Sequence, residues 1–362
     1  MAIERIVAYP IRFPFLSGGF TTSYGGRTAL ENLLIAIEAD GWTGHGEICQ
    51  PTGKPPPPLD EAELGVTRDR LGTLVGAPAG DVAGAMARLG EAPRNLRHAV
   101  QTALLDLMAQ RAGEPLVNLL GGRRCAAMPA YVSVGSDSPA VMARTMEIAR
   151  QQGIGCFQVK LDGDRTGDIA RVCEAAASLR RGESVLADAN GAYGLEEAGR
   201  LIAALPEGEI LVEEPCRGFE DNMALAQSCG RPLVLDQCLT SLTHYARVAS
   251  QGGVRGVVIK PTLLGGLQPA CAARDLCAAA GLAMRVDDSW TADVGSVAAL
   301  HLAAGTPADL LISTLDMRDY FEGRMFSGGP RTEAGAITVP DAPGLGLQVL
   351  PESLGTPAFV LS

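Results

Sequence analysis

The sequence predicts an α/β fold in which an α+β domain precedes a (β/α) barrel, a modified TIM barrel. From Met128 onward, short runs rich in β-branched residues alternate with alanine-rich helical segments. Successive runs end about 25 residues apart, which is typical of β-then-α units wound into a barrel. A doubly wound open sheet is disfavoured, because no glycine-rich dinucleotide fingerprint follows a first strand.

The N-terminal part of the chain has the pattern of strands followed by helices. Residues 4–10 and 29–39 are predicted strands, and the Asp40-Gly41 turn leads into a third strand at 42–48. Between the first two strands, residues 16–27 contain four glycines and are expected to form either a mobile loop or a plain connector.

The predicted domain boundaries follow the breaks in these patterns. Prolines at 55–58 interrupt the chain, residues 94–112 have the apolar spacing of an amphipathic helix, and Gly121-Gly122 ends the region. We therefore expect an N-terminal α+β domain at 1–122 and a barrel at 123–325. A C-terminal segment at 326–362 should pack back on the first domain.

The predicted barrel strands end in charged residues. Active sites of such barrels lie at the C-terminal ends of the strands. The eight runs are residues 130–134, 156–160, 184–188, 210–213, 232–236, 256–260, 282–287 and 309–313. The second to seventh runs end in, or are directly followed by, ionisable side chains: Lys160, Asp188, Glu213 with Glu214, Asp236, Lys260, and Asp287 with Asp288. One such acid could be a helix cap or a surface ion pair, but six consecutive strands indicate charges that bind something.

Three of these acids predict a metal site. Asp188, Glu213 and Asp236 end neighbouring strands and should converge on one side of the mouth. Carboxylate oxygens suit Mg²⁺, with Mn²⁺ second, and the absence of histidine at these positions disfavours zinc. Glu213 is preferred to Glu214 because only one of two successive strand residues faces inward. Asn190 could orient a ligand or a metal-bound water.

The two lysines predict proton transfer. Strands two and six lie opposite each other in an eight-stranded ring, so Lys160 and Lys260 should face each other across the mouth. One lysine could remove the proton next to a metal-bound substrate carboxylate, and the other could return a proton or assist a leaving group. A nearby metal and a second cation are expected to lower the lysine pKa, as a base near neutral pH requires.

Composition excludes several partners. The chain has 362 residues, a net charge of -11 and no basic stripe, which disfavours nucleic acid and anionic membranes as partners. Nine scattered cysteines without a CxxC pair indicate a reduced, cytoplasmic protein. No signal peptide and no membrane span are expected.

At these residues the chain resembles the enolase superfamily, in its muconate-lactonizing-enzyme subgroup. The resemblance covers nearly the whole chain, from the helix ending before Gly121-Gly122 through the charged strand ends to residues 343–347. It implies that the N-terminal domain caps the barrel, that a Mg²⁺ ion assists a lysine base, and that the protein is a homo-oligomer, often an octamer. Two N-terminal loops, with Phe20, Tyr24 and residues 49–52, would close over the site and select substrate.

The chain departs from the family pattern in two places. Gln158 replaces the first lysine of the family's Lys-x-Lys motif, and Gln237 replaces an acid after the third metal ligand. Both changes are expected to alter pKa values at the site. The four histidines lie outside the strand ends, and a structural role is predicted for each.

Within the subgroup, the chain is most similar to hydroxyproline-betaine and proline-betaine epimerases. Gln158-Val-Lys160 and residues 265–268 and 286–290 carry this likeness. It implies racemisation or epimerisation of a small, proline-like amino acid or betaine. Asp316, with Asp287 and Asp288, could bind the substrate amine, although Asp316 could instead pair with Arg318.

Three alternatives stay open. The same base and metal could dehydrate a hydroxylated cyclic amino acid or sugar acid. Cycloisomerisation of a muconate-type dicarboxylate is disfavoured by the extra acids at the site. A barrel kept only for binding is disfavoured because both lysines and all three predicted metal carboxylates are present.

Overall fold

The barrel is one sheet of eight parallel strands in the order β14-β13-β12-β11-β10-β9-β8-β7. The computed structural model describes residues 1–22, 25–50, 60–135, 138–288 and 290–362, with backbone alone for 20–22 and 25–27. The two outer strands meet only through an isolated bridge between Ala130 and Thr314, so the barrel is nearly closed. The strands are β7 (Tyr131–Gly135), β8 (Cys156–Lys160), β9 (Ser184–Asp188), β10 (Ile210–Glu213), β11 (Leu233–Leu235), β12 (Gly256–Ile259), β13 (Ala283–Val286) and β14 (Leu311–Thr314).

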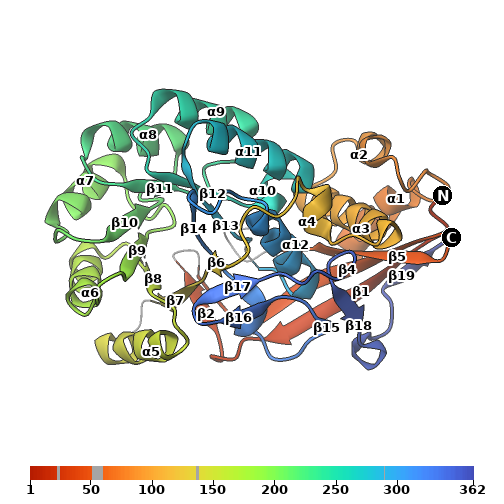
Figure 1. Cartoon of the computed structure of the whole chain (residues 1–362), viewed down its shortest axis with the longest axis horizontal. Coiled ribbons are helices and arrows are strands. Elements are labelled where there is room, and N and C mark those ends of the chain that lie inside the picture. Colours follow the sequence, from red (N-terminus) through yellow and green to blue (C-terminus); the bar gives the residue numbers. More distant parts are fainter. Residues whose placement is uncertain (23–24, 51–59, 136–137, 289) are drawn as a thin grey trace.

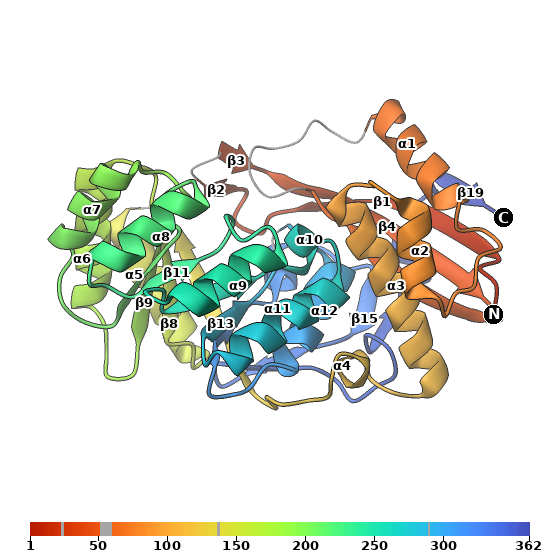
Figure 2. The ribbon, with the colours of Figure 1, turned by 90° about the horizontal axis from the view of Figure 1, so that it is seen from above.

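All eight predicted strands are present; three have the predicted bounds, and the others differ by one or two residues at an end, as expected where strand ends fray. The strands are buried on both faces because helices cover their outer side. The helices after the strands are α5 (Pro139–Gln151), α6 (Arg165–Ala177), α7 (Leu195–Ala204), α8 (Phe219–Ser228), α9 (Leu242–Gln251), α10 (Pro261–Leu264), α11 (Leu267–Ala279) and α12 (Asp293–Ala304). Figures 1 and 2 show them packed around the sheet.

The eighth unit differs from the predicted repeat. After β14 the described chain forms no α-helix, and the short 3₁₀ helix η1 (Met317–Tyr320) takes the place of one. Short strands follow instead: β15 (Phe326–Gly328), β16 (Arg331–Glu333), β17 (Ala336–Thr338) and β18 (Leu347–Val349), with the 3₁₀ helix η2 (Pro351–Ser353). Strand β17 pairs with β6 (Met128–Pro129), so this segment covers the place where the barrel sheet begins. Glycines and prolines between residues 323 and 346 explain why no eighth helix forms.

The capping domain contains residues from both ends of the chain. Its antiparallel sheet has the order β19-β1-β4-β5, with β1 (Arg5–Pro14), β4 (Ala29–Ala39), β5 (Trp42–Ile48) and β19 (Phe359–Leu361). Helices α1 (Glu61–Gly72), α2 (Val82–Leu89), α3 (Arg94–Ala112) and α4 (Leu116–Leu119) accompany it. Both termini lie at this domain in Figure 1. The predicted fold class is therefore confirmed, whereas the boundaries at 122 and 325 stay a prediction.

The segment expected to be a loop contains strand pairing. Strands β2 (Phe20–Thr22) and β3 (Gly25–Arg27) form a two-stranded hairpin that extends from the capping sheet toward the barrel in Figure 2. Neither the expected mobile loop nor a plain connector at 16–27 included this pairing of Gly25 and Gly26 with Thr22 and Thr21. Among the described helices, none has the length and apolar character that crossing a bilayer would require.

Candidate active site

The charged side chains predicted from the strand ends lie together at one end of the barrel. Lys160, Asp188 and Glu213 are the last residues of β8, β9 and β10, and Asp236 and Lys260 directly follow β11 and β12. The pairing register places Asp188 beside both Lys160 and Glu213. All five side chains are buried. The sheet therefore converts a sequence pattern into one cluster of charges.

Each lysine is ion-paired to the carboxylate of the neighbouring strand. Lys160 Nζ lies 2.5 Å from Asp188 Oδ2, and Lys260 Nζ lies 2.6 Å from Asp236 Oδ2. In the strand order, β8 and β12 are separated by three strands on either side of the nearly closed barrel. The two amines therefore approach the mouth from opposite sides.

The carboxylate oxygens of the predicted metal site are unequally satisfied. Asp188 Oδ2 accepts hydrogen bonds from Lys160, from Gln158 Nε2 at 3.0 Å and from Asn190 Nδ2 at 3.2 Å, and its Oδ1 accepts from Asn190 N–H. In contrast, Glu213 Oε1 and Asp236 Oδ1 are buried without a hydrogen-bond partner. Buried oxygens of this kind call for an explanation, and a bound cation is one.

The three acids of the predicted metal site do not form a complete set of metal ligands in this arrangement. Within the described residues, no group of three or more His, Cys, Asp or Glu side chains is placed to hold a metal ion. One oxygen of each acid contacts a cationic side chain instead: Lys160 for Asp188, Arg285 for Glu213, and Lys260 for Asp236. The two unpartnered oxygens come from neighbouring strands and are hard donors, so the donor set fits Mg²⁺.

Glu213 and Glu214 face different surroundings, as strand alternation predicts. Glu213 contacts Gln158 and Arg285 inside the barrel. Glu214 accepts hydrogen bonds from the backbone N–H groups of Asp236 and Cys238 and so holds the turn after β11. Burial raises the pKa of Glu214 to about 8.

The lowered lysine pKa was expected next to a bound metal ion, and that expectation stays a prediction. Burial alone would lower the pKa of Lys260, but the carboxylates of Asp236, Asp287 and Glu213 outweigh it and raise this pKa above its usual range. Without the charge of a metal ion, the surrounding acids decide the direction of this shift. As placed here, Lys260 is an ammonium and therefore a proton donor.

Arg285 and Tyr131 are part of the site and were missed. Arg285, on β13, contacts Glu213 Oε2 through Nη1 at 2.5 Å and Asp287 Oδ2 through Nη2 at 2.8 Å. Its guanidinium stacks on the Tyr131 ring, 4.4 Å from the ring centre. A signal was available, because Arg285 precedes Asp287 by two residues and therefore shares its inward face.

The acids expected to bind a substrate amine have protein partners. Asp287 Oδ2 accepts from Tyr131 Oη at 2.9 Å as well as from Arg285. Asp288 accepts from the N–H of Thr262 at 2.9 Å and from its hydroxyl. These contacts tie the ends of β12 and β13 together.

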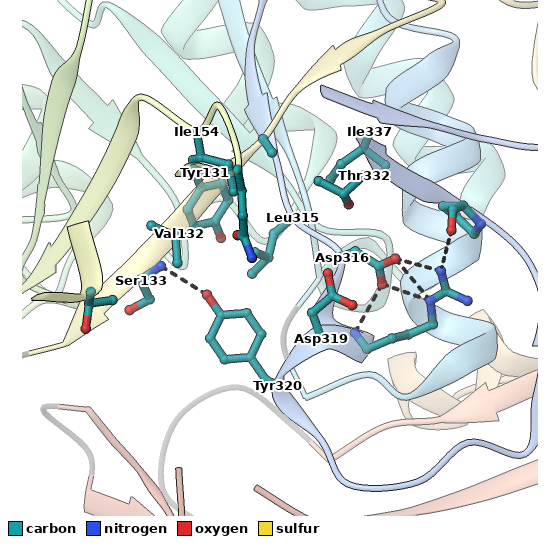
Figure 3. Close-up of a pocket in the computed structure, with 15 residues that line it drawn as sticks. Tyr131, Val132, Ser133, Ile154, Leu315, Asp316, Asp319, Tyr320, Thr332 and Ile337 are labelled. Atoms are coloured by element: carbon teal, nitrogen blue, oxygen red, sulfur yellow. Dashed lines mark hydrogen bonds and ion pairs between the residues drawn. The ribbon is translucent and has the colours of Figure 1, made fainter. Parts of the chain in front are cut away.

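Asp316 is paired with Arg318, the alternative that the sequence left open, and its binding of a substrate amine stays a prediction. Its Oδ2 lies 2.7 Å from Arg318 Nη2, and its Oδ1 accepts from Ser296 Oγ and from Arg318. Figure 3 shows this cluster beside a pocket of about 580 Å³ between β7, η1 and β16 and β17. There Tyr320 Oη accepts a hydrogen bond from the Ser133 N–H across the gap between the first and last barrel strands.

The loop residues are the least described part of the prediction. Phe20 belongs to β2, of which only the backbone is described, and Tyr24 and residues 51–52 lie outside the described residues. The four histidines lie away from the strand ends: His45 beside Asp106, His98 within α3, His244 stacked on Phe219, and His301 accepting from Val117 N–H.

Comparison with known proteins shows which families share this architecture. Residues 11–121 match the model of the mandelate racemase/muconate lactonizing enzyme N-terminal domain, and residues 141–353 match the enolase C-terminal domain-like model. A mandelate racemase/muconate lactonizing enzyme structure from Roseovarius nubinhibens, complexed with magnesium, superposes with a TM-score of 0.91 at 29% identity over the full length of both chains.

Two curated relatives span nearly the same length. A cis-3-hydroxy-L-proline dehydratase from Roseibium aggregatum is 28% identical over 99% of both chains. An L-Lys-D/L-Arg epimerase from Methylococcus capsulatus is 29% identical over 96% of this chain and 99% of its own.

The barrel, its capping domain and the charged strand ends thus define an enzyme of the enolase superfamily. The chain belongs to the mandelate racemase/muconate lactonizing enzyme family.

Proposed function

We propose that this protein removes the α-proton of a small cyclic amino acid, with loss of water when the substrate carries a 3-hydroxyl group. The observation that supports it most is the pair of buried lysines on opposite sides of the barrel mouth, each ion-paired to a carboxylate of the next strand. Such a pair places a base on one face of a substrate and an acid on the other.

Asp188, Glu213 and Asp236 are the residues that would hold a Mg²⁺ ion. The unpartnered buried oxygens of Glu213 and Asp236 support this assignment, as does the magnesium bound by the Roseovarius relative. When bound, the ion supplies positive charge that neutralises the substrate carboxylate and the negative charge developing on it as the α-proton leaves.

The lysines have distinct proposed roles. Lys160 takes the α-proton, and Lys260, which contacts Asp236 and Asp287, faces the opposite side of the substrate and donates a proton. Asn190, which contacts both Lys160 Nζ and Asp188 Oδ2, keeps that amine and carboxylate in place.

Water loss fits this arrangement for one stereoisomer. In a 3-hydroxyproline whose hydroxyl is cis to the carboxylate, the α-hydrogen and the hydroxyl lie on opposite faces of the ring. Lys160 removes the α-hydrogen, the Cα–H electrons form a double bond to C3, and the C3–O bond breaks. Lys260 gives its proton to the departing hydroxyl, so that water leaves. The full-length dehydratase relative supports this reaction.

Epimerisation is the second candidate. With a substrate that lacks the 3-hydroxyl, Lys260 would return a proton to the α-carbon from the other face and invert it. The two opposed amines and the relative named an epimerase both favour this outcome. A dicarboxylate substrate is disfavoured because Asp287 and Asp288 add negative charge beside the mouth. Assembly as a homo-oligomer stays a prediction.

Proton exchange with solvent tests the proposal. Purified protein with Mg²⁺ in D₂O is incubated separately with cis-3-hydroxyproline, trans-3-hydroxyproline, proline and trans-4-hydroxyproline, and each α-proton signal is followed by NMR. We expect loss of water from the cis-3 isomer at least tenfold faster than from the trans-3 isomer, because one lysine lies on each face. A difference of about 1.4 kcal/mol between the activation free energies of the two isomers gives a tenfold difference in rate.

Lysine variants provide the control. Lys160→Ala and Lys260→Ala should each lower the rate of water loss by at least about a hundredfold, which is the usual contribution of a positioned acid or base. Deuterium incorporation without water loss would favour epimerisation. No exchange with any of the four substrates would contradict the proline-like substrate.

A further inference from the structure

Arg285 spans the interior of the barrel between two parts of the candidate site. It comes from β13, whereas Glu213 comes from β10, and two strands separate them in the sheet. Arg285 is among the largest fully buried side chains of the described residues, with 2% exposure. A buried guanidinium is costly unless its donors are satisfied, so its partners identify what it does.

Every nitrogen of this guanidinium has an acceptor. Nη1 donates to Glu213 Oε2 at 2.5 Å, Nη2 donates to Asp287 Oδ2 at 2.8 Å and to Tyr131 Oη at 3.3 Å, and Nε donates to Asp287 Oδ2 at 3.1 Å. The planar fork therefore fixes two carboxylates from two strands in a set geometry, whereas a lysine offers a single ammonium with freely rotating donors.

The hydrogen bond from Arg285 Nη1 determines which oxygen of Glu213 remains available to bind a ligand. Both Arg285 and Gln158 donate to Oε2, the latter at 3.3 Å, so this oxygen is held from two sides. The other oxygen, Oε1, is buried and has no hydrogen-bond partner. Arg285 thereby presents one oxygen of this carboxylate, in a fixed orientation, for a ligand other than the protein.

The hydrogen bonds from Arg285 Nε and Nη2 hold Asp287 beside Lys260, the proposed proton donor. Asp287 uses Oδ2 for Arg285 and Tyr131, and its Oδ1 lies 3.8 Å from Lys260 Nζ. One arginine thus connects the metal side of the site to the amine on the opposite strand.

We propose that Arg285 is a positioning residue that orients Glu213 for a divalent cation and Asp287 for Lys260. This inference rests on the proposed function, because it requires that Glu213 bind the cation. It adds a residue that neither the strand-end pattern nor the comparisons assign.

The first test is the affinity for Mg²⁺. Arg285→Lys keeps the positive charge but loses the fork. Metal-depleted protein is titrated with Mg²⁺ by isothermal calorimetry, with folding checked by circular dichroism and melting temperature. We expect a dissociation constant about 10- to 100-fold higher than in the wild type, the usual effect of losing a partner that orients a metal ligand.

A matched control is Arg274 on α11, which is also buried and lies away from the strand ends. Arg274→Lys should bind Mg²⁺ as tightly as the wild type. Should Arg285→Lys fail to fold, the double variant Arg285→Met/Asp287→Asn removes one charge of each sign. It should show the same weakening, because Glu213 again loses the fork.

The outcomes separate the two proposals. Wild-type protein that binds no Mg²⁺ would contradict the proposed function and this inference with it. Wild-type binding that is unchanged in both Arg285 variants would overturn the inference alone. A weakened affinity, with the rate of α-proton exchange recovering at high Mg²⁺ concentration, would support Arg285 as a positioning residue and exclude a purely structural role.

Discussion

At the scale of single residues, a buried charge is stabilised by the groups that donate hydrogen bonds to it. Glu47 of β5 is an example outside the barrel mouth. Its carboxylate accepts from the N–H groups of Ala292 and Gly295 at the start of α12 and from Asn32 Nδ2. Because α12 follows β13, this contact lets the capping domain hold the chain that comes after Asp287 and Asp288.

Glu47 should make stability depend on pH. Burial, assisted by the nearby Asp293 charge and opposed by the three hydrogen bonds, raises the pKa of Glu47 from 4.5 to about 7. Between these values the folded protein binds a proton that the unfolded chain has released. The contribution of Glu47 to the free energy of unfolding therefore falls as pH rises from about 4.5 to 7, and it is constant above that range.

Urea denaturation of the wild type and Glu47→Gln at several pH values measures this effect. The difference between their free energies of unfolding isolates Glu47 from other titrating groups, such as the buried His98 and His301. The wild type should lose on the order of 3 kcal/mol relative to the variant between pH 4.5 and 7.5. A difference that stays constant across this window would show that Glu47 has an ordinary pKa.

At the scale of elements, two glycines allow strand β5 to contact helix α3 closely. A Cβ atom at Gly46 would overlap the carbonyl group of Ala99, and one at Gly44 would overlap that of Ala103. Both obstacles are backbone atoms of a long buried helix, so neither can move aside cheaply. The alternation Gly44-His45-Gly46 is therefore a packing requirement of the capping domain.

Gly46→Ala should lower the free energy of unfolding by at least about 1–3 kcal/mol, the usual cost of overpacking. The control is Gly65→Ala in the interior of α1, where an added Cβ has no neighbour within 4 Å. That change should stabilise the protein by about 0.5–1 kcal/mol, because alanine favours a helix. Thermal melting of both variants checks the opposite signs, and equal effects would refute the packing argument.

At the scale of the whole molecule, the C-terminal strand completes the capping sheet. Strand β19 pairs with β1 from Ile6–Leu361 to Ala8–Phe359, and Ala358 N–H donates to Ala8 O. Both chain ends thus meet in one sheet, to one side of the barrel (Figure 1). Without β19, β1 would present unpaired backbone groups to other molecules.

Removing residues 357–362 should therefore lower the melting temperature and add concentration-dependent association, as measured by light scattering after size-exclusion chromatography. Val360→Thr is the control, because Val360 is exposed and its backbone pairing would remain. Association in the control, or its absence in the truncated protein, would show that the edge of β1 is not what β19 protects.

The strand-end pattern predicted most of the fold and much of the site. Barrel strands repeat locally in sequence, and parallel strands bring their C-terminal ends to one face, so the positions of Lys160, Asp188, Glu213, Asp236 and Lys260 followed from their place in each run. The hairpin at Phe20–Thr22 and the missing eighth helix did not follow, because short glycine-rich segments carry weak periodicity.

The sequence by itself therefore determined the succession of strands and helices and which strands end in charge. Only the tertiary structure decided which charged side chains contact each other. Arg285 reaches Glu213 and Asp316 turns to Arg318, while three carboxylates keep Lys260 protonated. The physical reason is distance: alternation and repeat length act between neighbours in the chain, whereas hydrogen bonds and burial in the barrel join side chains from strands far apart in sequence.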